Sequence, residues 1–294
     1  MFNPTRLVID AFVTILKDNY DRTFGLQQPE YPRILAYITQ VALENIANSD
    51  APYHDMHHTM LVTEVGQEIL MARQLARGGI TPAIWMEYTI ATLCHDIGYV
   101  RGVCPGDEAG QYLINAQGES VALAPGCTDA ALTPWHVDRS KLFVRKRFGH
   151  LEFLDVERIE ECLERTRFPK PLLEGSPDDL GGLVRAADLI GQMADVNYLR
   201  KTAALFCEFQ ETGTNQALGY QNPEDLRQGY PAFFWKVVEP DIKPALRLLS
   251  VTQTGRQWLN NLYANVFIQE HSGCTVRFGQ ETPGCNGSRK PSAG

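Results

Sequence analysis

The sequence predicts an all-α protein. Apolar residues recur every three or four positions through most of the 294 residues, which is the spacing of the buried face of a helix, and the alternation typical of half-buried strands is scarce. The one long stretch without helical periodicity is 99–138, which is rich in glycine, proline and small residues. We expect helices at residues 5–20, 31–48, 56–77, 82–97, 140–149, 151–167, 180–213 and 241–270.

The N-terminal segment is expected to be a helix and not a targeting sequence. Its apolar stretch from Leu7 to Leu16 is interrupted by Asp10 and lacks a small-residue cleavage site. No apolar run in the chain reaches the roughly 18 residues that are needed to span a bilayer.

The expected helix at 56–77 carries a histidine on its apolar face. It ends near Gly78 and Gly79, which supply a helix stop. The residues on the apolar face are His58, Leu61, Val62, Val65, Ile69 and Ala72. His57, about 100° further round the helix, is expected to face elsewhere.

Two further helices place acids beside their apolar faces. The inner face of the helix that begins at Pro82 comprises Ile84, Tyr88, Ala91 and His95. The inner face of the helix that begins at Leu180 comprises Leu180, Val184, Ala187 and Gly191. Asp96 directly follows His95, and Asp188 adjoins Ala187.

These inward acids and histidines indicate a metal site. A carboxylate that faces the interior costs several kcal/mol unless it is paired, neutralised or bound to a cation. The expected ligands are His58, His95, Asp96 and Asp188. Two imidazoles and two carboxylates suit Zn, Fe, Mn or Co and leave coordination positions open for water, as catalytic sites do. The alternative is that each residue is an ordinary polar residue with partners of its own.

The order of these residues resembles the HD superfamily of metal-dependent phosphohydrolases. The string from Tyr53 to His58, Tyr-His-Asp-Met-His-His, is similar to the Tyr-His-Asn-x-x-His opening of the cyclic-nucleotide phosphodiesterase branch of that superfamily. Later strings similar to this branch are Ala187-Asp188-Leu189, Glu208-Phe209 and Phe233-Phe234-Trp235-Lys236-Val237-Val238-Glu239-Pro240. The resemblance spans roughly residues 50–245.

The resemblance implies an HD-domain-like helical bundle. We expect one domain over residues 1–271, with its motif core at about 50–245. The sequence from 272 to 294 turns to glycine, serine, proline and lysine, which predicts a disordered tail.

The resemblance also implies a mechanism. One or two divalent ions, Zn, Mn, Fe or Mg, would activate a water for attack on phosphorus, and Asp96 would be able to bridge two ions. In the phosphodiesterase branch, the histidine at the place of His54 is the general acid that protonates the leaving oxygen. The resemblance thus assigns catalytic roles to His54 and Asp96. The alternative for His54 is a residue at a helix start that satisfies local backbone groups.

Departures from the phosphodiesterase branch fall where that branch selects its substrate. Ile97-Gly98-Tyr99 stands where the branch has another acid and a histidine. Tyr230 occupies the place of the base-reading glutamine, while Phe233 keeps the place of the aromatic residue that stacks on the base. Arg167 replaces an acidic residue, which would favour an anionic substrate. A cyclic nucleotide is therefore not the expected substrate.

Weaker candidates lie in the middle of the chain. Lys141 and Arg145 share a helix face at i, i+4 spacing and are candidates to hold a substrate phosphate, although such a run is more often a solvated face. His136 is a candidate ligand for a second metal, and His150 is a weaker one. The segment 99–138 is either a lid over the metal site or a surface excursion.

Composition narrows the class of function. A net charge of −8 argues against a nucleic-acid-binding surface, and seven cysteines without a CxxC pair fit reduced thiols in a cytoplasm. The expected function is hydrolysis of a small, nucleotide-like phosphodiester, with no membrane partner. The alternatives are a phosphomonoesterase, a metal-containing binding or regulatory module without turnover, and a di-iron oxygenase.

Overall fold

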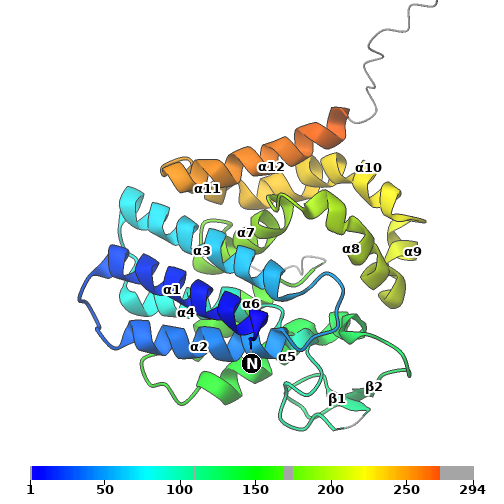
Figure 1. The fold of residues 1–294 in the computed structure, drawn as a ribbon, viewed down its shortest axis with the longest axis horizontal. Helices are drawn as coiled ribbons and strands as arrows, with labels where there is room; N and C mark the ends of the chain where they lie inside the picture. The colour runs from blue at the N-terminus through cyan, green and yellow to red at the C-terminus, as the bar shows by residue number, and fades with distance from the viewer. Residues whose placement is uncertain (1, 109, 169–174, 272–294) are drawn as a thin grey trace, which may run out of the picture.

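The computed structural model describes residues 2–108, 110–168 and 175–271, and it confirms the all-α prediction (Figure 1). The first helices are α1 (Pro4–Phe24), α2 (Tyr31–Ile46), α3 (Met56–Arg77), α4 (Pro82–Cys94) and the 3-10 helix η1 (Ile97–Tyr99). The middle elements are β1 (Gln111–Leu113), β2 (Ser120–Ala122), the 3-10 helix η2 (Asp129–Trp135), α5 (His136–Phe148) and α6 (Val156–Arg165). The last elements are α7 (Leu180–Met193), α8 (Tyr198–Thr212), α9 (Thr214–Leu218), α10 (Pro223–Phe233), the π-helical turn η3 (Phe234–Val238), α11 (Glu239–Leu249) and α12 (Gln253–His271).

Side-chain caps explain why three predicted helix starts are confirmed. The Asp55 side chain accepts from the His58 amide at 2.8 Å at the start of α3, and Asp179 accepts from the Gly182 amide at 2.7 Å at the start of α7. Thr81 caps α4 in the same way, directly before Pro82. Such caps satisfy backbone amides that have no partner within the helix.

The prediction of one helix over 180–213 is wrong, because the chain breaks between α7 and α8. The carbonyl of Met193 at the end of α7 accepts from the Tyr230 hydroxyl at 3.0 Å and from the side-chain amide of Asn265 at 2.9 Å. The same Asn265 amide donates to the Asp195 carbonyl at 2.9 Å. Partners distant in sequence thus replace the helical hydrogen bonds that the break leaves unmade.

The prediction of one helix over 241–270 is also wrong, because a turn separates α11 from α12. The Gly255 amide donates to the Thr252 hydroxyl at 3.0 Å, and this hydroxyl donates to Glu68 on α3. A Cβ on Gly255 would lie 2.2 Å from the Leu249 carbonyl oxygen, so the tight turn requires glycine.

Helix α10 and the strands β1 and β2 are among the elements that were not predicted. Helix α10 begins with a capping box, in which Asn222 and Asp225 each accept from the other's backbone. In the segment 99–138, β1 and β2 form an antiparallel hairpin that pairs Tyr112 with Val121.

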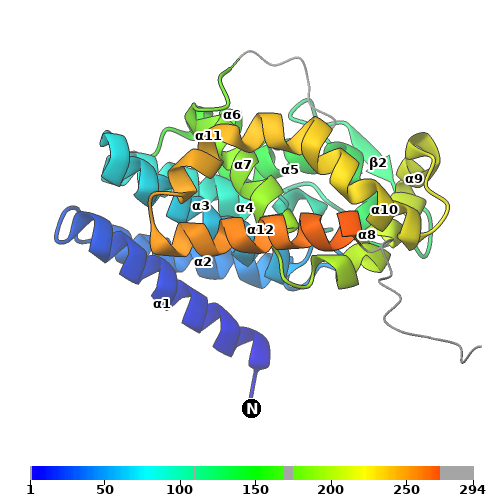
Figure 2. The same cartoon turned by 90° about the horizontal axis from the view of Figure 1, so that it is seen from above.

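Helices α3 and α7 form the centre of the fold. In Figure 1, α11 and α12 run across one side of this pair, while α1, α2 and α4 lie on the other, and Figure 2 shows α1 along the outer edge. The buried apolar side chains form a core cluster that reaches from Ile9 on α1 to Val266 on α12. No helix in the described ranges combines the length and apolar character that crossing a membrane requires. The expected single domain stays a prediction, and the expected tail over 272–294 lies outside the described residues.

The two central helices approach one another closely because small residues line the contact. A Cβ on Gly191 of α7 would lie 2.8 Å from the Val62 Cα and 2.9 Å from its amide nitrogen on α3. On the other helix, a Cβ on Gly66 would lie 3.3 Å from the Ala187 Cβ. The backbone of α7 therefore lies directly on α3.

A buried arginine anchors the segment 99–138 to α5. The guanidinium of Arg139 is fully buried and donates to both carboxylate oxygens of Asp107, at 3.0 and 2.9 Å. It also donates to the carbonyls of Gly98, Val100 and Leu113. These contacts tie β1 and the residues before it to α5, and the lid alternative for this segment stays a prediction.

We expect Gly191→Ala to destabilise the protein by about 1–3 kcal/mol, because the new methyl group meets the α3 backbone, which cannot move aside alone. Urea unfolding measures this difference. Gly229→Ala on α10 is the control, since its Cβ would first meet the Tyr220 hydroxyl, at the end of a side chain, at 2.9 Å. Equal stabilities of the two variants would contradict the close α3–α7 contact.

We expect Arg139→Met to lower stability by about 3–5 kcal/mol, because it leaves the Asp107 carboxylate buried without its cation. Arg145→Met is the matched control on the same helix. The Arg145 side chain is 53% exposed on the surface beside Glu157 and Glu160, so its loss should cost about 1 kcal/mol or less. Thermal and urea unfolding of both variants would test this, and similar losses would refute the anchoring role.

Candidate metal centre

The four predicted ligands converge from three parts of the fold. His58 lies in the first turn of α3, His95 and Asp96 follow α4, and Asp188 lies in the middle of α7. His58, His95 and Asp96 are buried, and the Asp188 side chain is 20% exposed. The capped start of α3 and the close α3–α7 contact bring His58 opposite Asp188.

The ligand atoms face a common point. The Nε2 atoms of His58 and His95 are 3.2 Å apart. Asp96 Oδ2 lies 3.3 Å from the first and 3.0 Å from the second, and Asp188 Oδ1 lies at 3.5 and 3.6 Å. One ligand atom from each of His58, His95 and Asp188 fits within 4.8 Å of the others.

The hydrogen bonding of His95 shows which atom is available as a ligand. Its Nδ1 lies 2.8 Å from the Thr92 carbonyl oxygen, so it carries the proton and donates there. In the neutral ring the Nε2 then presents a lone pair toward the cluster. Asp96 Oδ2 is buried and has no well-aligned hydrogen-bond donor among the described residues. Lone pairs that converge in this way fit a divalent cation. Metal-bound histidines typically donate their other ring nitrogen to a backbone carbonyl, as His95 does to Thr92.

The pKa shifts show that the cluster attracts positive charge. Burial opposes protonation of His95, but the neighbouring Asp96 carboxylate outweighs it and raises the pKa to about 9. Burial likewise opposes protonation of His58, while the adjacent Asp188 and Asp96 carboxylates raise its pKa to about 8. Burial would raise the pKa of Asp96, yet the adjacent histidines hold it well below its usual range. Protons or a metal ion can supply this charge.

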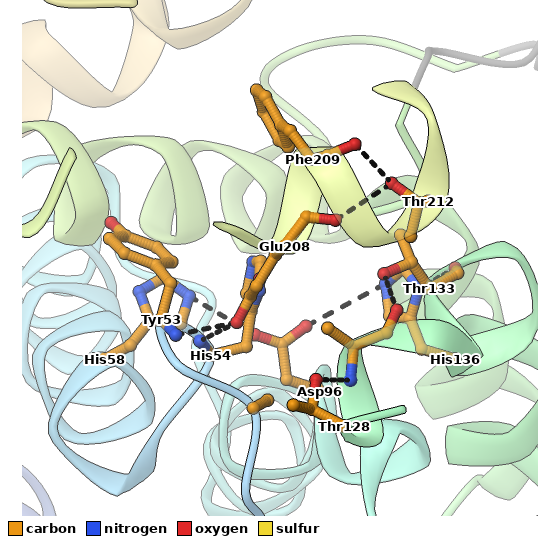
Figure 3. Close-up of polar contacts among 12 residues, drawn as sticks. Tyr53, His54, His58, Asp96, Thr128, Thr133, His136, Glu208, Phe209 and Thr212 are labelled. Atoms are coloured by element: carbon orange, nitrogen blue, oxygen red, sulfur yellow. Dashed lines mark hydrogen bonds and ion pairs between the residues drawn. The ribbon is translucent and has the colours of Figure 1, made fainter. Parts of the chain in front are cut away.

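A histidine and glutamate pair lies beside the cluster (Figure 3). His54 Nδ1 lies 2.5 Å from Glu208 Oε2, and Glu208 Oε1 accepts from the amides of Tyr53 and His54 at 2.6 and 3.1 Å. Burial opposes protonation of His54, but the Glu208 carboxylate overcomes it and raises the pKa. Glu208 therefore orients the ring, favours its charged form and leaves Nε2 as the ring nitrogen that it does not bind.

Two further residues complete this side of the site. The Tyr99 ring is stacked between His54 and His136, with ring centroids at 4.7 and 4.6 Å. His136 Nδ1 lies 2.6 Å from the Thr133 carbonyl oxygen, and its Nε2 lies 3.8 Å from Asp96 Oδ1. Burial lowers the pKa of His136. His136 thus faces the second oxygen of Asp96, and its role as a ligand for a second metal stays a prediction.

The predicted basic substrate contacts form ion pairs in the structure. Lys141 contacts Glu164, and Arg167 contacts both Glu164 and Asp138. Arg145 pairs with glutamates of α6 on the surface. The solvated-face interpretation therefore describes Arg145, while Lys141 and Arg167 belong to a charge network between α5 and α6.

The two predicted aromatic contacts differ in their surroundings. Tyr230 is buried, its ring centroid lies 5.0 Å from that of Tyr198, and its hydroxyl is already donated to Met193. Phe233 is half-buried and meets Phe168 edge-on at 6.1 Å. Substrate contact by either residue stays a prediction, and in this structure Tyr230 serves the core.

Some contacts of this site could not be predicted from the sequence. The contact of His54 with Glu208 joins residues 154 positions apart, and Glu208 was noted only as part of a similar string. In the sequence, Tyr99 is only part of a departure from the phosphodiesterase branch. His57 faces away from the cluster, as expected, with its side chain 48% exposed and a hydrogen bond to Lys201.

These observations define an all-α protein with a buried histidine and aspartate cluster that can hold a divalent metal ion. The chain belongs to the Npun_R2479-like family, whose model matches residues 2–272. That description names no activity or ligand. No curated protein matches the chain.

We expect His58→Ala to weaken binding of Mn or Zn by more than the roughly 10- to 100-fold that loss of an outer-shell partner costs, because it removes a direct ligand. Titration calorimetry and elemental analysis measure this effect. His57→Ala is the matched control at the neighbouring position and should leave the affinity unchanged. Equal affinities of the two variants would refute the ligand set.

Proposed function

We propose that this protein is a metal-dependent phosphohydrolase of the HD type. The observation that carries the proposal is the convergence of two imidazoles and two carboxylates beside a histidine whose ring is held by Glu208. Metal ligands with open positions and an adjacent proton donor are the parts that ester hydrolysis needs. The order of the residues along the chain, which resembles the HD superfamily, is a second support.

The ligand set accommodates one or two divalent ions. His58, His95, Asp96 and Asp188 would hold the first, and the mixed nitrogen and oxygen donors suit Zn, Mn or Fe, with Mg as a further candidate. Asp96 Oδ1 faces His136, so the same carboxylate offers an oxygen to a second ion. A divalent ion in this set supplies a water of lowered pKa and polarises a phosphoryl oxygen.

The protein's own proton chemistry is assigned to His54. Glu208 binds Nδ1 and stabilises the charged ring, so Nε2 donates the proton to the leaving oxygen. General acid catalysis of this kind is worth about a hundred- to ten-thousandfold in rate. Glu208 acts through His54 and is a positioning residue.

Basic side chains that are already paired with acids favour a diester over a monoester as the proposed substrate. Arg167, Lys141 and Lys201 each form an ion pair with an acid, so their charge is already partly used. A monoester dianion would need more positive charge than a diester monoanion. A nucleotide-like phosphodiester is therefore the proposed substrate, with a phosphomonoester as the alternative. Phe233 is the candidate to stack on an aromatic base.

Two other functions have specific discriminating measurements. A binding or regulatory module without turnover would hold the metal and hydrolyse no ester. A di-iron oxygenase would contain iron after anaerobic preparation, but such centres use more histidines than the four-residue ligand set offers. The proton donor at His54 favours hydrolysis over both.

The proposed setting is the cytoplasm, with a small-molecule phosphate ester as the partner. The cysteines of the described residues are free thiols, which suits a reducing compartment. The acidic net charge of −8 disfavours nucleic acid as a partner.

The test is hydrolysis of bis(para-nitrophenyl) phosphate and para-nitrophenyl phosphate with added Mn, Mg or Zn. Asp96→Ala should lose both the metal and the activity. His54→Ala should keep the metal, yet lose about a hundredfold or more in turnover of diphenyl phosphate, a diester with a poorer leaving group, and less on the nitrophenyl esters. His57→Ala should behave as wild type.

Each outcome has a distinct meaning. A higher rate on the diester supports the proposed substrate class, and a higher rate on the monoester supports the alternative. Activity that survives in Asp96→Ala, or metal lost in His54→Ala, would overturn the assignment of roles. Bound metal with no turnover of either ester would favour the binding module.

A further inference from the structure

Three aromatic rings from separate elements form a continuous stack at the edge of the metal centre. His54 precedes α3, Tyr99 ends η1, and His136 begins α5. The Tyr99 ring is nearly parallel to both neighbours, at 11° to His54 and 20° to His136. In Figure 3, His54 and His136 lie on either side of Asp96. One tyrosine thus spans the interval between two histidines that flank a ligand.

The backbone holds this tyrosine in place. Its amide donates to the Asp96 carbonyl at 3.1 Å, and its side chain is buried, with 3% exposure. The preceding Gly98 is pressed against α5, where an added Cβ would lie 1.9 Å from the His136 carbonyl oxygen. The Gly98 amide also donates to the Ser140 hydroxyl at 2.9 Å. Tyr99 therefore cannot move without displacing the start of α5.

The stack supplies what the Glu208 contact alone does not. A single hydrogen bond at Nδ1 fixes one edge of the His54 ring, but the ring plane can still turn about that bond. A parallel aromatic face at 4.7 Å fixes the plane. The neutral phenol face also attracts the charged imidazolium more than an aliphatic side chain would. Together, Glu208 and Tyr99 determine where Nε2 points.

We infer that Tyr99 is a positioning residue for proton transfer, whose ring face holds His54 in the orientation that delivers its Nε2 proton to the leaving oxygen. This inference rests on the proposed hydrolase function. The phenyl ring is the active feature, and the hydroxyl is dispensable for it. A misplacement of the proton donor by about 1 Å can lower the rate of the chemical step by about a hundredfold. The effect of losing the Tyr99 ring should therefore appear in kcat more than in KM.

The experiment compares Tyr99→Phe with Tyr99→Leu on two diesters, bis(para-nitrophenyl) phosphate and diphenyl phosphate. Phenolate is the poorer leaving group, so its departure depends more on a proton from His54. Tyr99→Phe should keep kcat within about twofold on both, while Tyr99→Leu should lose about tenfold or more on diphenyl phosphate and clearly less on the nitrophenyl ester. Metal content should be unchanged in both.

A double variant separates positioning from a general structural effect. In the His54→Ala background, Tyr99→Leu should cause little further loss, because the residue through which it acts is gone. Equal losses on both esters, a loss in Tyr99→Phe as large as in Tyr99→Leu, or losses that add fully to His54→Ala would each overturn the inference. If Tyr99→Leu does not fold, Tyr99→Met provides the same test with an unbranched side chain.

A measurement without substrate separates failure of this inference from failure of the proposed function. Histidine NMR spectra, assigned with His54→Ala and His136→Ala, should show ring-current shifts at both imidazoles in wild type and Tyr99→Phe. Those shifts should vanish in Tyr99→Leu, with broadening of the His54 signals as the ring turns. Unchanged His54 signals in Tyr99→Leu would refute the positioning role whether or not the protein hydrolyses esters. If the wild type hydrolyses no ester but the expected NMR changes are seen, the proposed function would be refuted. The orientation of His54 by the Tyr99 ring would still stand.

Discussion

The close approach of α3 and α7 is the constraint on which the rest of the structure depends. Because Gly191 has no side chain, the backbone of α7 lies against Val62, one turn along α3 from His58. Asp188 precedes Gly191 by one turn and therefore reaches across to His58 Nε2. Any larger residue at the contact would separate a carboxylate from its partner imidazole. The geometry of the metal centre is thus set by main-chain packing rather than by the flexibility of its ligands.

The histidine and aspartate cluster contains more buried hydrogen-bond acceptors than donors to satisfy them among the described residues. Two carboxylates and two imidazoles meet in a buried space, where the carboxylates raise the pKa of His58 and of His95 against the effect of burial. A buried set of acceptors costs stability unless a cation occupies it. Such a set of acceptors agrees with the proposed cation site, and the His54 and Glu208 pair lies next to it.

Helix starts and inward faces were predictable from the sequence, while breaks and cross-chain contacts were not. The starts of α3, α4 and α7 follow from local caps, and the inward positions of His58 and His95 follow from helical spacing. The break after Met193 depends on Tyr230 and Asn265, which lie far along the chain and give no local cue. The similar string predicts that Tyr230 contacts the substrate, and in the structure its hydroxyl donates to the Met193 carbonyl at the break. Glu208 stands in a string similar to the phosphodiesterase branch and Tyr99 in a departure from it, but neither string indicates the contact with His54, which exists only in three dimensions.

The Arg139 anchor has a consequence for how this fold can vary. Its guanidinium ties the base of the hairpin at Asp107 and Leu113 to the same helix that carries His136, so the base and the metal centre share one rigid support. The hairpin tip beyond it, around Gln117 and Gly118, is exposed, and the amides of Gln117 and Glu119 donate to the Asn115 side chain. Changes in the length of that tip, or a peptide inserted there, would be absorbed outside the anchor. The tip is thus a place where the chain can be lengthened while the Arg139 anchor stays intact.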